Sequence, residues 1–389
     1  MYKKYLLLIF FIFVNILGFA SEITVIPFYY DTERQAIFIY AELGKKKGYF
    51  TFDTGSDMSM IFDNEVNYSG FTVSQKNRNI WIGNMDLTMN MYSSSNITLA
   101  GNLLSGRYNF TVTNNPLIID NFSAGIAGIL GMDIFHGKIF EISMTDSVIR
   151  IYDKIPNYYE NKLPILSETY EDLRLYIPVK INGNTYKALI DTGASFSFGL
   201  SQNIVLDKGE NSVKVYISKA YSAPYNRDFK LVRKNSVEIM GIALNDKIFK
   251  THTHDEVKNE GIIGTQFLAR FDMLIDLRNE HKFMLYYKQN LPSEYFSLFI
   301  NGDMEVNGII NANINGVNLE ILEILENSPA WIAGLRAGTL ITHLNSKPVL
   351  SYTIDSIRTL LLGKNLLKVT FIDSNGKEKT VKIKPRKML

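Results

Sequence analysis

The tripeptide Asp-Thr-Gly occurs twice in this chain, and each copy directly follows an apolar run that reads as a strand. The first copy is Asp53-Thr54-Gly55 and the second is Asp191-Thr192-Gly193. Each copy is followed, after a similar interval, by two bulky aliphatic residues and a glycine, at Ile129-Leu130-Gly131 and at Ile262-Ile263-Gly264. This correspondence predicts a duplicated unit in which each half supplies one carboxylate.

A single Asp-Thr-Gly would mean little, because the same residues suit an ordinary β-turn. Two copies that share a preceding strand and a following aliphatic triplet favour a common role over two unrelated turns. The match also continues past the triplets, since Gly131 to Phe140 parallels Gly264 to Asp272. The repeat is therefore longer than the motifs that reveal it.

The residue types in the two copies suit acid–base chemistry. Two carboxylates held close together cannot both ionise readily, so they share a proton and act as base and acid. Thr54 and Thr192 are expected to hydrogen-bond to backbone and hold the two turns together, while Gly55 and Gly193 allow tight turns. Such a pair activates water against a peptide carbonyl without a metal or covalent intermediate, so we expect no cofactor and no metal.

These residues resemble the active-site motifs of the aspartic proteases in their duplicated, single-chain form. The resemblance implies that Asp53 and Asp191 are the catalytic pair, with Thr54, Gly55, Thr192 and Gly193 supporting them. It implies a mainly β, bilobal fold, with one lobe in residues 21–155 and the other in 156–290. The alternative is a non-catalytic peptide-binding scaffold that keeps this fold. A third possibility is that the lobes dimerise and the C-terminal domain is an assembly module.

The composition limits the chemistry and the partners expected of this chain. The chain has no cysteine, which excludes disulfides, thiolate catalysis and cysteine-based zinc sites. A net charge of +2 argues against nucleic acid as a partner. His252 and His254 alternate as they would on one strand face, but no further ligand pattern accompanies them, so a solvated loop is the favoured interpretation.

The first twenty residues read as a secretory signal. Lys3 and Lys4 precede an apolar run from Tyr5 to Phe19, and small residues then suit cleavage after Ala20. Without cleavage, the same run would anchor the chain to a membrane. Export of a cysteine-free chain favours a bacterial periplasm or cell envelope, with secretion as the alternative.

Residues 295–389 have a sequence pattern that differs from that of the two repeated halves. Their pattern Ser328-Pro329-Ala330, Ala333-Gly334-Leu335 and Ala337-Gly338 resembles PDZ domains of the bacterial kind, and implies a small α+β domain. The pattern departs from that family at Thr339 and Ser346, where an acidic residue and a glycine are usual.

PDZ domains add an extended peptide to a sheet edge and take its terminal carboxylate on backbone N–H groups. On that resemblance the peptide-binding residues are Gly308, Ile309 and Ile310, beside a helix over residues 352–362. The alternative is that the domain packs on the lobes and has only a structural role. Together these features predict an exported aspartic endopeptidase that acts on polypeptides, with a PDZ domain that selects substrates or partners.

Overall fold

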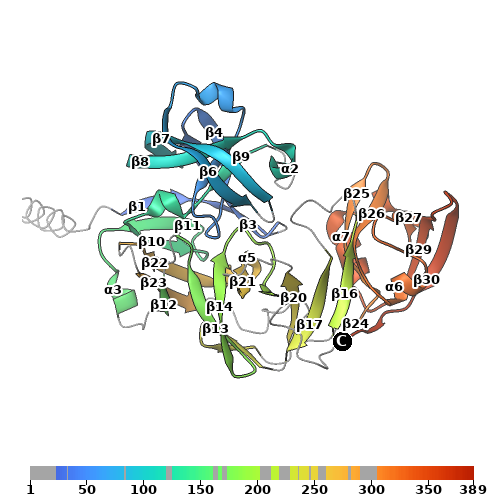
Figure 1. The fold of residues 1–389 in the computed structure, drawn as a ribbon. Helices are drawn as coiled ribbons and strands as arrows, with labels where there is room; N and C mark the ends of the chain where they lie inside the picture. The colour runs from blue at the N-terminus through green and yellow to red at the C-terminus, as the bar shows by residue number, and fades with distance from the viewer. Residues whose placement is uncertain are drawn as a thin grey trace, which may run out of the picture.

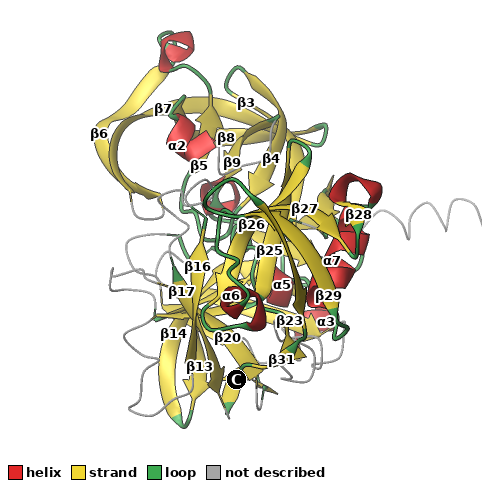
Figure 2. Cartoon of the chain, turned by 90° about the vertical axis from the view of Figure 1, so that its right-hand side faces the viewer, coloured by secondary structure: helices red, strands yellow, loops and turns green. Residues whose placement is uncertain are grey.

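The computed structural model describes residues 23–389 except 33, 83–84, 120–124, 161–164, 169–172, 202–211, 219–227, 235, 245–246, 253–259, 279–281 and 290–304. The predicted signal segment, residues 1–20, lies outside this part of the chain. Within it, no helix is both long and apolar enough to span a membrane. The fold is mainly β with a few short helices (Figures 1 and 2), as the sequence predicts.

An eight-stranded sheet forms the first part of the molecule, in the order β2-β3-β4-β9-β5-β8-β7-β6. Its strands are β2 (Tyr29–Asp31), β3 (Ala36–Leu43), β4 (Lys46–Phe52), β5 (Ser59–Phe62), β6 (Thr72–Ile82), β7 (Met85–Leu99), β8 (Asn102–Thr113) and β9 (Ile126–Leu130). Strand β4 runs parallel to β9, and β5 lies between β9 and β8. The apolar side chains of β4, Phe50 and Phe52, are fully buried.

The second part repeats this arrangement. Its strands are β13 (Tyr176–Ile181), β14 (Asn184–Asp191), β15 (Phe198–Ser201), β16 (Ser212–Ile217), β17 (Phe229–Lys234), β18 (Val237–Ile239), β19 (Ile242–Ala243), β20 (Lys247–His252) and β21 (Gly261–Gly264). Strand β14 runs parallel to β21, and β15 lies between β21 and β20. The duplication predicted from the motifs is therefore present in the strand order.

A short helix follows the aliphatic triplet in each half. These helices are η3 (Met132–Phe135) and α5 (Thr265–Leu268), each of which begins directly after its glycine. The predicted turn at residues 182–184 connects β13 to β14, where Asn182 and Gly183 have positive φ angles of 49° and 85°. The hairpin β6–β7 is longer than expected, and its turn at residues 83–84 lies outside the described residues.

A six-stranded sheet in the order β1-β11-β10-β22-β23-β12 joins the two halves (Figure 1). Its strands are β1 (Thr24–Pro27), β10 (Ile139–Ser143), β11 (Val148–Tyr152), β12 (Ile165–Glu168), β22 (Phe271–Asp276) and β23 (Lys282–Gln289). Four of these strands form two antiparallel hairpins, β10–β11 and β22–β23. Their pairing through β10 and β22 was not predicted, and it places Glu141 opposite Leu274.

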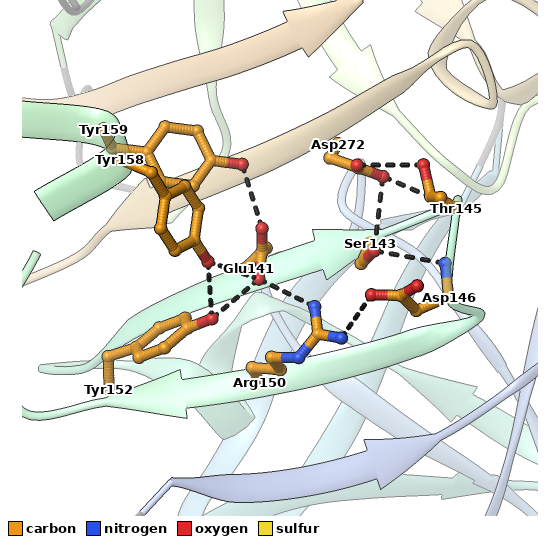
Figure 3. A network of polar contacts seen from close by, with 9 residues as sticks. All are labelled: Glu141, Ser143, Thr145, Asp146, Arg150, Tyr152, Tyr158, Tyr159 and Asp272. Carbon is orange, nitrogen blue, oxygen red and sulfur yellow. Dashed lines mark hydrogen bonds and ion pairs between the residues drawn. The ribbon is translucent and has the colours of Figure 1, made fainter. Parts of the chain in front are cut away.

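The segment 153–172 connects the first half to the second. It contains helix α3 (Asn157–Glu160) and strand β12, which pairs with β23. Two tyrosines of α3 reach Glu141 of β10: Tyr158 Oη donates to Glu141 Oε2 at 3.1 Å and Tyr159 Oη to Glu141 Oε1 at 3.0 Å (Figure 3). The connection between the halves is therefore fixed onto the shared sheet.

Figure 3 shows that the same carboxylate also binds strand β11. Arg150 Nη1 donates to Glu141 Oε2 at 3.0 Å, and Tyr152 Oη donates to the same oxygen at 2.7 Å. On the neighbouring strand, Asp272 of β22 accepts hydrogen bonds from Ser143 and Thr145 (Figure 3). Buried carboxylates with several donors of this kind rigidify the structure around them.

The C-terminal part has its own core. It consists of β24 (Glu305–Val306), β25 (Ile309–Asn315), β26 (Asn318–Leu325), α6 (Pro329–Ile332), β27 (Leu340–Leu344), β28 (Lys347–Pro348), η6 (Val349–Ser351), α7 (Ile354–Leu362), β29 (Leu367–Ile372), β30 (Glu378–Ile383) and β31 (Arg386–Lys387). Residues from Ile309 to Ile383 form one buried apolar cluster. At the turn before β28, Asn345 and Ser346 have positive φ angles of 47° and 67°.

Strand β26 joins this domain to the second half of the molecule. It pairs with β25 along one edge, while its other edge pairs first with β27 and then with β16, through Val215↔Leu325 to Ile217↔Glu323. Sheet pairing therefore continues from β16 into the C-terminal domain (Figure 1). Leu325 and Val306 share an apolar cluster with Val215 and Phe229, so side chains as well as backbone hold the junction.

Candidate active site

The two Asp-Thr-Gly turns meet at the centre of the molecule. Asp53 follows β4, and its N–H donates to the Leu130 carbonyl of the parallel strand β9 at 2.9 Å. Asp191 ends β14 and lies opposite Gly264 of the parallel strand β21. In each half a buried apolar strand pair thus delivers one carboxylate to the end of the sheet, as predicted.

The two threonines tie these turns to each other through four hydrogen bonds. Thr54 N–H donates to Thr192 Oγ1 and Thr192 N–H donates to Thr54 Oγ1, both at 3.0 Å. Each hydroxyl also donates across the interface at 2.8 Å, Thr54 to the Ile190 carbonyl and Thr192 to the Phe52 carbonyl. Both threonines are buried, so these hydrogen bonds form away from water and fix the relative position of the acids.

The glycines allow the acids to approach. A β-carbon added at Gly55 would lie 2.6 Å from Asp191 Cγ, and one added at Gly193 would lie 2.5 Å from Asp53 Cγ. Each acid also accepts an N–H from its own turn, Gly55 to Asp53 Oδ1 and Gly193 to Asp191 Oδ1, both at 2.8 Å. Only glycine leaves room for the partner carboxylate at these positions.

The two carboxyl groups lie close enough that the ionisation of one affects the pKa of the other. Burial raises the pKa of Asp191 well above its usual range, and the charge of Asp53 raises it further. Burial also raises the pKa of Asp53, but the hydrogen bond from Asp191 and backbone N–H donors oppose that rise. Because the pKa of each carboxyl is raised, the pair favours a single shared proton.

The aliphatic triplets support the turns from behind. Gly131 packs against the Met58 backbone, where a β-carbon would come within 2.6 Å, and Gly264 packs against the Phe196 carbonyl, where it would come within 2.1 Å. Beyond the glycines, Met132 N–H donates to the Ser56 carbonyl at 2.9 Å, and Thr265 Oγ1 donates to the Thr192 carbonyl at 2.6 Å. The triplets therefore lie directly behind the turns that carry the two acids.

Sequence reasoning missed a third acid behind the first turn. Ser59 Oγ donates to Asp133 Oδ1 at 2.8 Å and accepts the Gly131 N–H at 3.1 Å. Asp133 Oδ2 is buried and, among the described residues, has no hydrogen-bond partner. Burial raises the pKa of Asp133 to about 7. The sequence feature that could have revealed Asp133 is an acid in the otherwise apolar helix η3, directly after Gly131.

The β6–β7 hairpin also contacts the first turn. Arg78 Nη2 lies 3.1 Å from Asp57 Oδ2, four residues after Asp53, and Met58 packs with Ile80 and Met91 of the hairpin. The hairpin therefore contacts the turn that carries Asp53 through residues near its tip rather than at its open end.

The predicted peptide-binding residues lie at the start of β25. Gly308 has a φ angle of 106° and packs so tightly on Ser328 that a β-carbon would come within 1.9 Å of its hydroxyl. The Ile309 N–H donates to Asn307 Oδ1 at 2.8 Å, so an internal acceptor already occupies it. Ile310 packs against the apolar cluster at the junction with the second half. Asn307 itself is fully buried and was not singled out from the sequence.

Comparison with known protein families finds one domain. Residues 320–370 match the PDZ domain family, in the region where the sequence pattern predicted it. The chain therefore carries a C-terminal PDZ domain, which in other proteins binds peptides. No curated protein matches the chain.

Proposed function

We propose that this chain is an aspartic endopeptidase whose two β units are the lobes of an aspartic-protease-like fold. The observation that carries the proposal is the close approach of the two Asp-Thr-Gly turns. Gly55 packs on the Asp191 carboxyl and Gly193 on the Asp53 carboxyl, while Thr54 and Thr192 hydrogen-bond across the junction. A pair of carboxyls that share one proton is the arrangement that general acid–base hydrolysis requires.

In the proposed reaction a water molecule binds between the two acids. The Asp53 carboxylate takes a proton from the water as the oxygen attacks the peptide carbonyl, and Asp191 gives its proton to the carbonyl oxygen. The amine then leaves with the proton that Asp53 took from the water, while a hydroxyl of the tetrahedral intermediate returns a proton to Asp191 and restores the pair. Gly55 and Gly193 keep each carboxylate within reach of the other, so the proton needs to move only a short distance.

We further propose that the protein is exported and acts on polypeptides in a bacterial periplasm or cell envelope. The basic and apolar N-terminal sequence supports this localisation. The PDZ domain is proposed to contact either the substrate or a protein partner. The N-terminal sequence of protein recovered from cells tests the localisation, with Ser21 expected as the first residue.

Cleavage of an unfolded protein substrate tests the proposed activity. Wild-type protein should release new N-termini, and Asp53→Asn and Asp191→Asn should each abolish the release. Asp153→Asn is the matched control, because Asp153 is exposed and far along the chain from both turns. Tight peptide binding without cleavage by wild-type protein would instead favour the non-catalytic scaffold.

A further inference from the structure

A lysine lies on the same sheet face as Asp191. Four neighbouring strands connect the two residues through their register. Leu189 of β14 lies opposite Ile262 of β21, and Ile262 lies opposite Gly199 of β15. Gly199 in turn lies opposite Lys250 of β20. Residues directly opposite each other in neighbouring strands project to the same face, and so do residues two apart in one strand. Asp191 is two residues beyond Leu189, so the sheet presents Asp191 and Lys250 on one side.

The distance between strands β14 and β20 places Lys250 within reach of a substrate that is bound in an extended conformation at Asp191. Three strand spacings of about 4.8 Å separate β14 from β20, which is about 14 Å in total. An extended peptide advances about 3.3 Å per residue, so this separation corresponds to about four residues. Gly199, which stands between Ile262 and Lys250 in this register, contributes no side chain.

Two aromatic rings surround the Lys250 ammonium group. Its Nζ lies 4.1 Å from the centroid of the Phe229 ring and 5.6 Å from that of Phe196. Phe196 belongs to the segment that follows Asp191 and packs with Ile262 and Leu189. Burial among these groups lowers the pKa of Lys250, so the ammonium group has lost part of its hydration.

The ammonium group has unused hydrogen-bonding capacity. A lysine carries three N–H donors, yet in the described part of the chain Lys250 makes no side-chain hydrogen bond and no ion pair within 4.0 Å. Glu323 of the PDZ strand β26 stabilises the charged form of Lys250, and Lys250 stabilises the charged form of Glu323. A partly dehydrated cation without a direct partner gains most from an incoming anion.

We propose that Lys250 is a specificity-determining residue that binds a carboxylate of the polypeptide substrate, within about four residues of the cleaved bond. The carboxylate belongs either to an aspartate or glutamate side chain or to the C-terminus of the substrate. This inference rests on the proposed peptidase function. Because Glu323 interacts with the same cation, the PDZ domain contributes to this subsite and competes with the substrate carboxylate for Lys250.

Matched peptides separate the two sources of the carboxylate. One series carries a single glutamate at each of the four positions on either side of the cleaved bond, and its partner series carries glutamine. Another pair differs only in a free or amidated C-terminus. The wild-type enzyme should show a kcat/KM ratio of about ten in favour of the acid at one of these places.

Variants then assign that ratio to Lys250. Lys250→Met should reduce the acid-to-amide ratio to about one, and Lys250→Arg should retain part of it because the charge remains. Glu323→Gln should increase the ratio by removing the competing carboxylate. Lys180→Met is the matched control, since Lys180 is an exposed lysine of the same sheet, paired with Glu238 at 2.9 Å, and should leave the ratio unchanged.

The outcomes distinguish this inference from the proposed function. Equal cleavage of acid and amide peptides by wild-type enzyme would overturn the role of Lys250 while the peptidase function stands. A preference that persists in Lys250→Met would overturn it as well. If wild-type protein cleaves none of the peptides, the proposed function fails, and the dissociation constants of the same peptides decide the inference. Tighter binding of the acid form, lost in Lys250→Met, supports it, and equal binding of both forms contradicts it.

Discussion

The α-carbon of Gly55 faces the carboxyl group of Asp191, so closely that a methyl group on Gly55 would lie 2.6 Å from Asp191 Cγ. The same relationship holds between Gly193 and Asp53 at 2.5 Å. Each acid is therefore positioned partly by the turn of the opposite half. A change in one turn should disturb the acid of the other.

Gly55→Ala should reduce kcat by about a hundredfold, because the new methyl group displaces the Asp191 carboxyl by several tenths of an ångström or more. Gly70→Ala is the matched control, since Gly70 is exposed and a β-carbon there would meet nothing within 4 Å. The measurement is kcat and the free energy of unfolding for both variants. Unchanged kcat in Gly55→Ala would show that the carboxyl positions are less constrained than the packing requires.

Asp133 should make stability depend on pH. Its pKa is about 7 in the folded protein because of burial, with a smaller rise from the charge of Asp57, against about 4 when unfolded. The unfolded chain therefore loses this proton first as pH rises, so the contribution of Asp133 to the free energy of unfolding is largest below pH 4. That contribution decreases between about pH 4 and pH 7 and is constant above.

Asp133→Asn should remove this part of the pH dependence. Relative to wild type, the variant should gain stability steadily as pH rises from 4 to 7, as measured by thermal unfolding at each pH. Asp153→Asn should follow the wild-type curve, because Asp153 is exposed. Parallel curves for Asp133→Asn and wild type would contradict an elevated pKa at this site.

Glu141 should be a main source of stability where the halves join. Its carboxylate is 5% exposed and accepts hydrogen bonds from Arg150 and three tyrosines. Glu141→Gln removes the charge that Arg150 and the tyrosine hydroxyls need, and should cost about 3 kcal/mol in the free energy of unfolding. Glu42→Gln, which breaks the exposed pair with Lys47, should cost less than about 0.5 kcal/mol. Equal effects of the two changes would contradict the account.

Deletion of the PDZ domain should impair the enzyme as a whole. If the domain only selected substrates, a chain without it would be expected to cleave short peptides still. The structure changes that expectation, because deletion would expose Val215 and Phe229 and leave part of the β16 edge unpaired. A chain ending at residue 289 should lose activity on a short peptide and on a protein substrate alike. Selective loss on the protein substrate would show that the domain acts by docking substrate.

The positions of the two Asp-Thr-Gly turns could be predicted from sequence because their constraints are local. An apolar strand, an acid, a hydroxyl and a glycine follow one another within eight residues, and the second copy confirms the first. The aliphatic triplets were also recognisable, because close packing behind Asp53 and Asp191 requires glycine at positions 131 and 264. The turn at residues 182–184 was predictable for the same reason.

The contacts between distant segments could not be predicted. Strands β10 and β22 each read as one half of a hairpin, and nothing in either pattern indicates that the two pair with each other. Strand β26 likewise has the pattern of an ordinary strand, so its pairing with β16 is visible only in three dimensions. Lys250 and Asp133 gain their importance from neighbours far along the chain.

The central claim is that Asp53 and Asp191 act as one catalytic unit. It is tested most directly by kcat/KM for Asp53→Asn, Asp191→Asn and the double variant on one unfolded substrate. Neither carboxyl can complete the reaction without the other. We therefore predict that both single variants lose nearly all activity and that kcat/KM of the double variant is no lower than that of either single variant. Substantial activity in one single variant, or a double variant whose loss equals the product of the two single losses, would contradict the account.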